Sequence, residues 1–292
     1  MIKSISLGSY YFEIALIFRE ACYLSTLLLN SEVWHPITKK HIEALEAADA
    51  RFFELCFSTN SKTIRDAYYA ETGKLKIRHL IVKRRLLMLH NILRRDQSDM
   101  IVKVYQAQCL KPAKFDWAQI VSKDKMNYNV SLSDLEISKM SKNAFRAYIE
   151  RKVNGKSYLE LIHSDKAKIQ NIIQNLRPNK NWKLPITEYL KTNLLTTEEK
   201  KLLFSLRCIE YDFKSNYKTK YQEDMRCRIC LEEDSEEDEY HTYFKCKILI
   251  DSLKIDSTIK LEYLYGNLEQ QVRFIKHIMP VTMKRDTILQ IH

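Results

Sequence analysis

The sequence predicts an all-α fold built from several helical bundles. Apolar residues recur with helical periodicity along most of the 292 residues. There are only 4 glycines and 5 prolines, whereas about 20 glycines would be average for this length. Such scarcity of turn residues disfavours β-sandwiches and β-barrels. Neither a GxGxxG nor a GxxxxGK loop occurs, so the usual glycine-rich phosphate sites are excluded.

In the first part of the chain, capping residues place the predicted helices. The apolar stretch Phe12–Leu29 contains three charged residues, so we interpret it as a buried helix rather than a membrane span or signal peptide. Thr38 can cap the next helix, and Gly73 is a natural C-terminal cap. The predicted helices are Tyr10–Asn30, Thr38–Phe57, a short one from Ser61 or Thr63 to Gly73, Leu75–Arg95 and Met100–Leu110.

In the second part, Ser133-Asp-Leu-Glu136 and Thr196-Thr-Glu-Glu199 have the spacing of capping boxes and predict two helix starts. Ser141 can cap a third helix. Arg177–Asn181 is the clearest linker, and Pro280 should break the helix that contains it. Further helices are predicted at Phe115–Asp124, Tyr158–Leu176, Ile186–Lys191 and Leu268–Ile291.

The charge is strongly positive and uneven. The chain carries 48 Lys and Arg against 37 Asp and Glu, a net charge of +11. Leu231–Tyr240 contains seven acids and no base, so the remainder carries about +18. This charge favours polyanionic partners, nucleic acid first and an anionic membrane surface second. A merely soluble basic surface is the alternative.

The seven cysteines do not form a disulfide framework. Their number is odd, and four are isolated among apolar residues, where cysteine usually packs as a small hydrophobe. We therefore expect a reduced, intracellular protein, in the nucleus or the cytoplasm. Because no apolar run approaches the length needed to cross a bilayer, we expect no membrane partner.

Three of the cysteines have metal-ligand spacing. Cys227, Cys230, His241 and Cys246 form the pattern C-x2-C-x10-H-x4-C. Closed structural sites of this composition hold one tetrahedral Zn²⁺. With all four positions filled, no position remains for a catalytic water, so we expect one structural Zn²⁺.

Bases and aromatic residues flank these ligands. These bases could offset the formal charge of −1 on Zn²⁺ with three thiolates, or could contact phosphates; they are Arg226, Arg228, Lys245 and Lys247. Tyr243 and Phe244 could stack on bases, although a role in the core of the small module is the stronger interpretation.

A second candidate for nucleic-acid binding is the basic helix. Lys74–Arg95 contains eight Lys and Arg and no acid. At about 100° per residue, one face collects several of its bases and histidines, while Ile77, Ile81, Met88 and Ile92 collect on another. Arg84 and Arg85 lie nearer the apolar face and could pair with a buried acid such as Glu71. The predicted nucleic-acid face consists of Lys76, His79, Lys83, His90 and Arg94.

Several segments, in this order, are typical of one family. They are Tyr11–Glu20, Leu29–Trp34, Leu45–Asp49, Glu71–Arg78, Lys83–Arg85, Val104–Gln108, Asp116–Trp117, the cysteine/histidine site, Gln271–Lys276 and Lys284–Arg285. With them the chain resembles the C-terminal region of the reverse-transcriptase polyprotein of a non-LTR retrotransposon. One departure is Lys76, where the family pattern leads us to expect proline, so the helix start there is left open.

The resemblance implies a thumb-like helical region with the basic helix at 1–110, a helical connector at 111–215, a CCHC zinc knuckle at 216–250 and a C-terminal helical tail at 251–292. In such proteins the thumb grips the template–primer duplex and the knuckle region helps bind nucleic acid. The implied partners are RNA, DNA or a hybrid duplex, together with the polymerase domains that this chain lacks.

Polymerase chemistry needs paired aspartates for two metal ions, and this sequence has neither Tyr-x-Asp-Asp nor any adjacent Asp pair. No endonuclease-like acidic cluster follows the knuckle. We therefore expect a non-catalytic fragment of a reverse transcriptase that binds nucleic acid. The alternatives are a protein-interaction scaffold with an acidic docking loop, and an enzyme of another kind, for which no triad or ligand spacing is visible.

Overall fold

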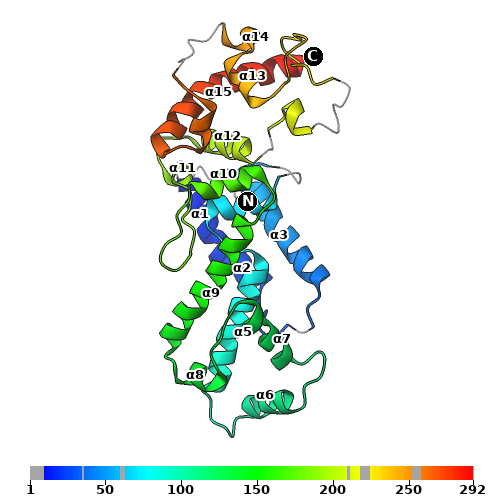
Figure 1. The fold of residues 1–292 in the computed structure, drawn as a ribbon, viewed down its shortest axis with the longest axis vertical. Coiled ribbons are helices and arrows are strands. Elements are labelled where there is room, and N and C mark those ends of the chain that lie inside the picture. The colour runs from blue at the N-terminus through cyan, green and yellow to red at the C-terminus, as the bar shows by residue number, and fades with distance from the viewer. Residues whose placement is uncertain are drawn as a thin grey trace.

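The computed structural model describes residues 10–34, 36–59, 63–208, 211–217, 224–251 and 258–291. Within these ranges there is no β-strand, which confirms the all-α prediction. Figure 1 shows an elongated molecule with α5–α9 at its lower end, α12–α15 at its upper end, and α1–α4, α10 and α11 between them.

Local capping set the helix starts as predicted. The side chains of Thr38, Ser133, Ser141 and Thr196 each accept a hydrogen bond from the backbone N–H three residues later. In the first half of the chain the helices are α1 (Tyr11–Phe18), a π-helical turn (Arg19–Tyr23), α2 (Leu24–Leu27), α3 (Lys39–Phe57), α4 (Arg65–Thr72), α5 (Ile77–Leu93), α6 (Met100–Leu110), α7 (Trp117–Asn127) and α8 (Asp134–Lys139).

The short helix predicted from Ser61 or Thr63 begins later. Ile64 is the N-cap of α4, so Thr63 lies outside that helix, and Ser61 lies outside the described residues. Gly73 ends α4 with φ 61°, the left-handed conformation predicted for a C-terminal cap. Lys76 is the N-cap of α5, which places the helix start that the resemblance left open.

One predicted helix start and one predicted break were wrong. Tyr158, where a new helix was expected to begin, lies inside a continuous α9 (Lys142–Ile162), because the buried face of Ile149 and Val153 stabilises this helix. Pro280 lies inside α15, where the fully buried Ile278 and Val281 anchor both sides of the proline. The remaining helices are α9 (Lys142–Ile162), α10 (Ala167–Gln174), α11 (Glu188–Lys191), α12 (Thr197–Arg207), η4 (Lys214–Tyr217), α13 (Glu239–Phe244), α14 (Lys247–Ile250), η5 (Leu261–Tyr265) and α15 (Leu268–Ile291).

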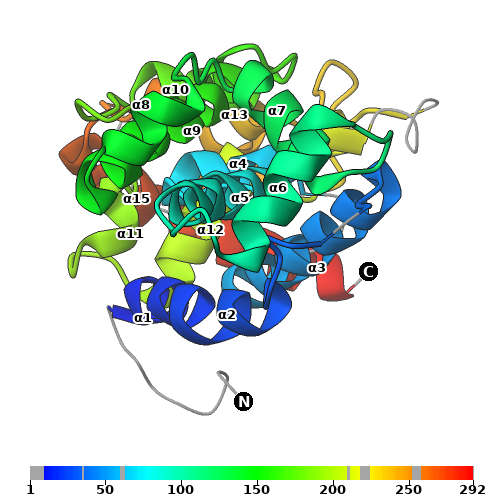
Figure 2. The ribbon, with the colours of Figure 1, turned by 90° about the horizontal axis from the view of Figure 1, so that it is seen from below.

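Two main apolar cores hold the molecule together. The upper core joins α1, α3, α4, α10–α12 and α15, and it also includes side chains of the cysteine-bearing segment. The lower core lies between α5, α6, α7, α8 and the first half of α9. Figure 2, which looks from below, shows α5 enclosed by its neighbours. The four-part division of the chain stays a prediction. The upper core contains side chains of both the predicted knuckle, 216–250, and the predicted tail, 251–292.

Charged pairs are buried inside the upper core. Arg19, on the π-helical turn, donates to both oxygens of Asp49 at 2.8 and 2.6 Å. Arg207 Nε donates to Glu71 at 2.5 Å, so the buried partner of Glu71 is on α12. Glu71 was therefore the wrong partner for Arg84 or Arg85, but Arg85 does pair with a buried acid, Asp124, at 3.1 Å.

In the described part of the chain, no helix combines the length and the apolar character that a transmembrane span requires.

Candidate metal centre

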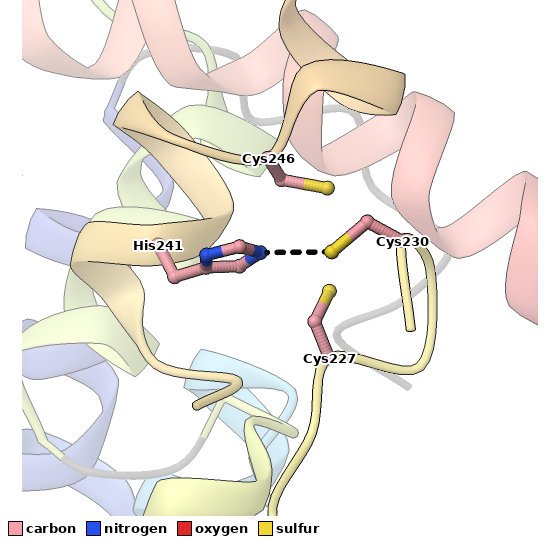
Figure 3. Close-up of side chains that lie close together, drawn as sticks. All are labelled: Cys227, Cys230, His241 and Cys246. Atoms are coloured by element: carbon pink, nitrogen blue, oxygen red, sulfur yellow. Dashed lines mark hydrogen bonds between the residues drawn. The ribbon is translucent and has the colours of Figure 1, made fainter. Parts of the chain in front are cut away.

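The four residues with metal-ligand spacing lie together. The ligand atoms of Cys227, Cys230, His241 and Cys246 are all within 4.8 Å of one another, and Figure 3 shows the three sulfur atoms and the imidazole turned toward a common centre. Cys230 Sγ lies 3.3 Å from His241 Nε2. A tetrahedral Zn²⁺, with Zn–S near 2.3 Å and Zn–N near 2.0 Å, would hold such atoms roughly 3.5–3.8 Å apart. The donor set therefore fits zinc with shifts of about an ångström at most.

Each ligand is positioned by short-range backbone contacts. The Cys227 N–H donates to the Ser235 carbonyl at 2.8 Å, and Cys227 and Cys230 share one turn. His241 lies in the first turn of α13, where its backbone N–H donates a hydrogen bond to the Asp238 carboxylate at 2.7 Å. Cys246 is the N-cap of α14. The two halves of the site thus come from a turn and from the junction of two short helices.

The surroundings favour a thiolate at Cys227. The Cys246 side chain is the main hydrogen-bonding partner, and the N–H groups of Cys230 and Ile229 also point at this sulfur; together they outweigh burial and lower the pKa of Cys227 to about 5. Cys227 and Cys246 are almost fully buried, and His241 is buried as well. Such an environment suits a closed structural site rather than an open catalytic one.

Beyond the ligands, a buried acid ties the knuckle to the last helix. Glu237 is fully buried, and its carboxylate accepts hydrogen bonds from Arg228 at 2.7 Å and from Arg285 of α15 at 2.5 Å. Burial raises the pKa of Glu237, but the hydrogen bonds of the two arginines and the charge of Arg285 lower it by more, so the pKa is lowered overall. Arg285 also lies over the rings of Tyr211 and Phe213. This cluster was not found from the sequence, because no spacing links residues 237 and 285.

The bases that flank the ligands differ in availability. Arg228 is engaged by Glu237 and Asp212. Arg226 is exposed but bonds Asp224 at 3.0 Å. Lys245 is exposed, lies 4.8 Å from the centroid of the Tyr240 ring, and has no ion-pair partner among the described residues. Of the flanking bases predicted to contact nucleic acid, Arg228 is the one that could reach a phosphate only by breaking its contact with the buried Glu237.

Of the two aromatic residues considered for base stacking, Tyr243 is fully buried against Phe213 and Phe274. Phe244 is half-buried and packs on Tyr240 and His277. Tyr243 is therefore part of the core, as the stronger interpretation held, and its ring is not accessible to a nucleic-acid base.

The predicted nucleic-acid face of α5 is mostly covered. His79 is fully buried, with Nδ1 2.8 Å from the Tyr128 hydroxyl. His90 is buried too, stacks on Phe145 and donates to the Met140 carbonyl at 3.0 Å. The expectation that these histidines meet a polyanion was wrong.

The lysines of the same face are engaged by acids. Lys76 is buried and pairs with Asp66 at 2.8 Å, and Lys83 pairs with Glu150 of α9 at 2.7 Å. Arg94 alone of the predicted five is exposed with no ion pair in the described structure. The reason is the central place of α5, which packs on α3, α7, α8 and α9. Helical periodicity separates two faces of a helix, but it does not show that both are covered.

Comparison of the chain with protein-family models, with curated proteins and with solved structures found no match. The resemblance to retrotransposon reverse transcriptases therefore stays a prediction from the sequence.

Proposed function

We propose that the chain is a non-catalytic nucleic-acid-binding protein whose Cys3His site holds one structural Zn²⁺. The observation that carries the metal assignment is the convergence of Cys227, Cys230, His241 and Cys246 within 4.8 Å. Three sulfurs and one imidazole are the donor set that Zn²⁺ prefers in closed sites. When bound, the ion would cross-link the Cys227–Cys230 turn to the α13–α14 junction.

The role of the ion would be to stabilise the upper core. Cys227, Ile229, Tyr243 and Cys246 belong to the same apolar cluster as α12 and α15. Glu239 of α13 also pairs with Lys168 of α10 at 2.7 Å. A metal that fixes the knuckle would therefore support the helices on which the knuckle packs.

Nucleic acid is supported as the partner by charge. Outside the acidic run the chain carries about +18, and this excess attracts polyanions irrespective of sequence. The proposed relationship to the C-terminal region of a retrotransposon reverse transcriptase points the same way. Because most of the α5 face is covered, the contacts must lie on cations that remain exposed, among them Arg94 at the end of α5 and Lys245 beside the metal site.

A protein-interaction scaffold is the second candidate, favoured by one observation. Glu237 and Glu239 of the acidic run are engaged by Arg285 and Lys168, whereas three acids at the tip of the run are exposed and could dock a basic partner. These are Glu232, Glu233 and Asp234.

Elemental analysis of the purified protein tests the metal. We expect one zinc per chain, reduced by Cys230→Ser and unchanged by Cys109→Ser, since Cys109 is exposed on α6 and remote from the site in the sequence. One zinc per chain that survives Cys230→Ser would refute the ligand assignment.

Filter binding at two salt concentrations separates the two candidate functions. Labelled duplex, RNA–DNA hybrid and single strand are compared, and the nucleic-acid proposal predicts submicromolar-to-micromolar binding of at least one of them with a steep salt dependence. Absence of binding to all three at low salt would leave the scaffold as the better candidate.

A further inference from the structure

The outer face of α9 carries a basic and aromatic stripe. The stripe consists of Tyr148, Arg151, Lys152, Lys156 and Leu159. Arg151 and Lys152 follow Tyr148 by three and four residues, Lys156 follows Lys152 by four, and Leu159 follows Lys156 by three, so all five share one side of the helix. The adjoining side, with Phe145, Ile149 and Val153, is buried in the lower core, and Tyr148 packs against the edge of that core. Arg151 and Lys156 of the stripe remain exposed.

A cavity of about 460 Å³ lies along this stripe. Its walls contain three cations and three aromatic rings, and no acid. Arg151 and Lys156 are exposed, Lys152 is half-buried, and none of the three has an ion-pair partner in the described ranges. The residues that line it are Asn127, Tyr128, Asn129, Tyr148, Arg151, Lys152, Gly155, Lys156, Leu159 and Trp182.

Trp182 lines the cavity and is positioned by the linker loop. Its backbone N–H donates to the Asn179 carbonyl at 2.8 Å, and the carbonyl of the preceding residue, Asn181, accepts a hydrogen bond from the Asn154 side-chain amide of α9 at 3.2 Å. The backbone of Trp182 is left-handed, φ 59°, which non-glycine residues seldom adopt. The indole packs on Tyr158 and against Gly155, yet 43% of the residue remains exposed. The loop therefore holds a partly exposed indole at the cavity.

From these features we propose that the α9–Trp182 cavity binds single-stranded nucleic acid, with one base stacked on Trp182 and the adjoining phosphates on Arg151, Lys152 and Lys156. Proteins that bind single strands combine such a positive groove with aromatic platforms. The volume is in the range of small-molecule sites and accommodates one nucleotide. The amides of Asn127 and Asn129 add donors and acceptors for a base edge. The site is distinct from the metal centre but rests on the proposed function for the nature of its polyanion.

Fluorescence anisotropy with a labelled eight-nucleotide single strand tests the cavity. Arg151→Glu/Lys156→Glu should weaken binding at least tenfold and reduce the logarithmic salt slope by about 1.4, which corresponds to two lost phosphate contacts. The matched control is Lys40→Glu/Lys103→Glu, which changes the net charge equally at exposed positions on α3 and α6. It should weaken binding by less than about threefold.

The stacking is tested separately. Trp182→Ala should weaken single-strand binding roughly 5- to 150-fold, the range found for loss of one base–aromatic stack. Saturation with the oligonucleotide should quench tryptophan fluorescence, and Trp182→Phe should remove the quenching while Trp34 and Trp117 still fluoresce. Circular dichroism checks that each variant remains helical, and Trp182→Phe is the variant to use if Trp182→Ala does not fold.

The outcomes separate this inference from the proposed function. If the unmodified protein binds a single strand, and the cavity double variant and the control double variant weaken this binding equally, the cavity assignment is overturned and the proposed function stands. If the cavity variants weaken binding of a duplex as much as that of a single strand, base stacking is overturned. If the unmodified protein binds no nucleic acid, both proposals fail.

Discussion

Replacement of Glu237 by glutamine should loosen the knuckle from the last helix. The substitution keeps the shape of the side chain and removes its charge, while Arg285 stays buried with only 2% of its side chain exposed. Removal of one partner from a buried ion pair typically costs about 3–5 kcal/mol. Arg285 retains the Asp212 carbonyl and the Asp286 carboxylate as acceptors, so we expect the low end, about 3 kcal/mol. This is a large part of the roughly 5–15 kcal/mol that stabilises a typical protein.

Urea unfolding of the zinc-loaded protein, followed by circular dichroism, measures this loss. Glu233→Gln makes the same chemical change at an exposed position of the same acidic run, and it should leave the free energy of unfolding unchanged within error. If the pair acts as a unit, Glu237→Gln/Arg285→Met should be less destabilised than the sum of its single variants, by about 0.5–3 kcal/mol. An effect of Glu237→Gln no larger than that of Glu233→Gln would refute the reasoning.

Three further outcomes are expected. Gly73→Ala should destabilise by at least about 2 kcal/mol in urea unfolding, because φ is 61° and a Cβ would lie 2.3 Å from a backbone oxygen; Gly155→Ala, with its nearest contact at 3.8 Å, should be neutral or stabilising by up to about 1 kcal/mol. Burial raises the pKa of Glu160, but His79, 3.3 Å away, and the charges of Lys76 and Arg78 lower it by more, so the pKa is lowered overall. The stability from this carboxylate is therefore complete above about pH 4.3 and is lost as the pH falls through its lower folded-state pKa, so Glu160→Gln should flatten the acid limb of stability measured between pH 3 and 7. Burial raises the pKa of Cys56 to about 12, so mass spectrometry should find this thiol unalkylated by iodoacetamide at pH 8 in the native protein and alkylated in urea; rapid native labelling would contradict its burial.

Features that depend on near neighbours were predictable. The capping serines and threonines start their helices as expected because the hydrogen bond spans three residues. The four metal-site residues were found from spacing alone, since all lie within twenty positions and their chemistry is specific. Gly73 was identified as a cap because its left-handed backbone is a local property.

Features that depend on how helices pack were not predictable. The basic residues of α5 form one face in the sequence, yet the helix lies at the centre of the lower core, so His79 and His90 are buried and Lys83 is paired. The cations Arg151 and Lys156 on α9 stayed exposed because an adjoining side of that helix, with Ile149 and Val153, fills the core. The intervals from Tyr148 to Lys156 were visible in the sequence, but nothing there distinguished an open stripe from a covered one.

Composition, periodicity and capping thus sufficed to predict an all-α chain, and ligand spacing sufficed to find the Cys3His cluster, because each depends on residues that are near one another in the sequence. The exposure of each cation, the pairing of Glu237 with Arg285 across 48 positions, and the meeting of Trp182 with α9 came from the packed structure. Burial and long-range pairing depend on which helices pack together, and a one-dimensional pattern does not record that choice.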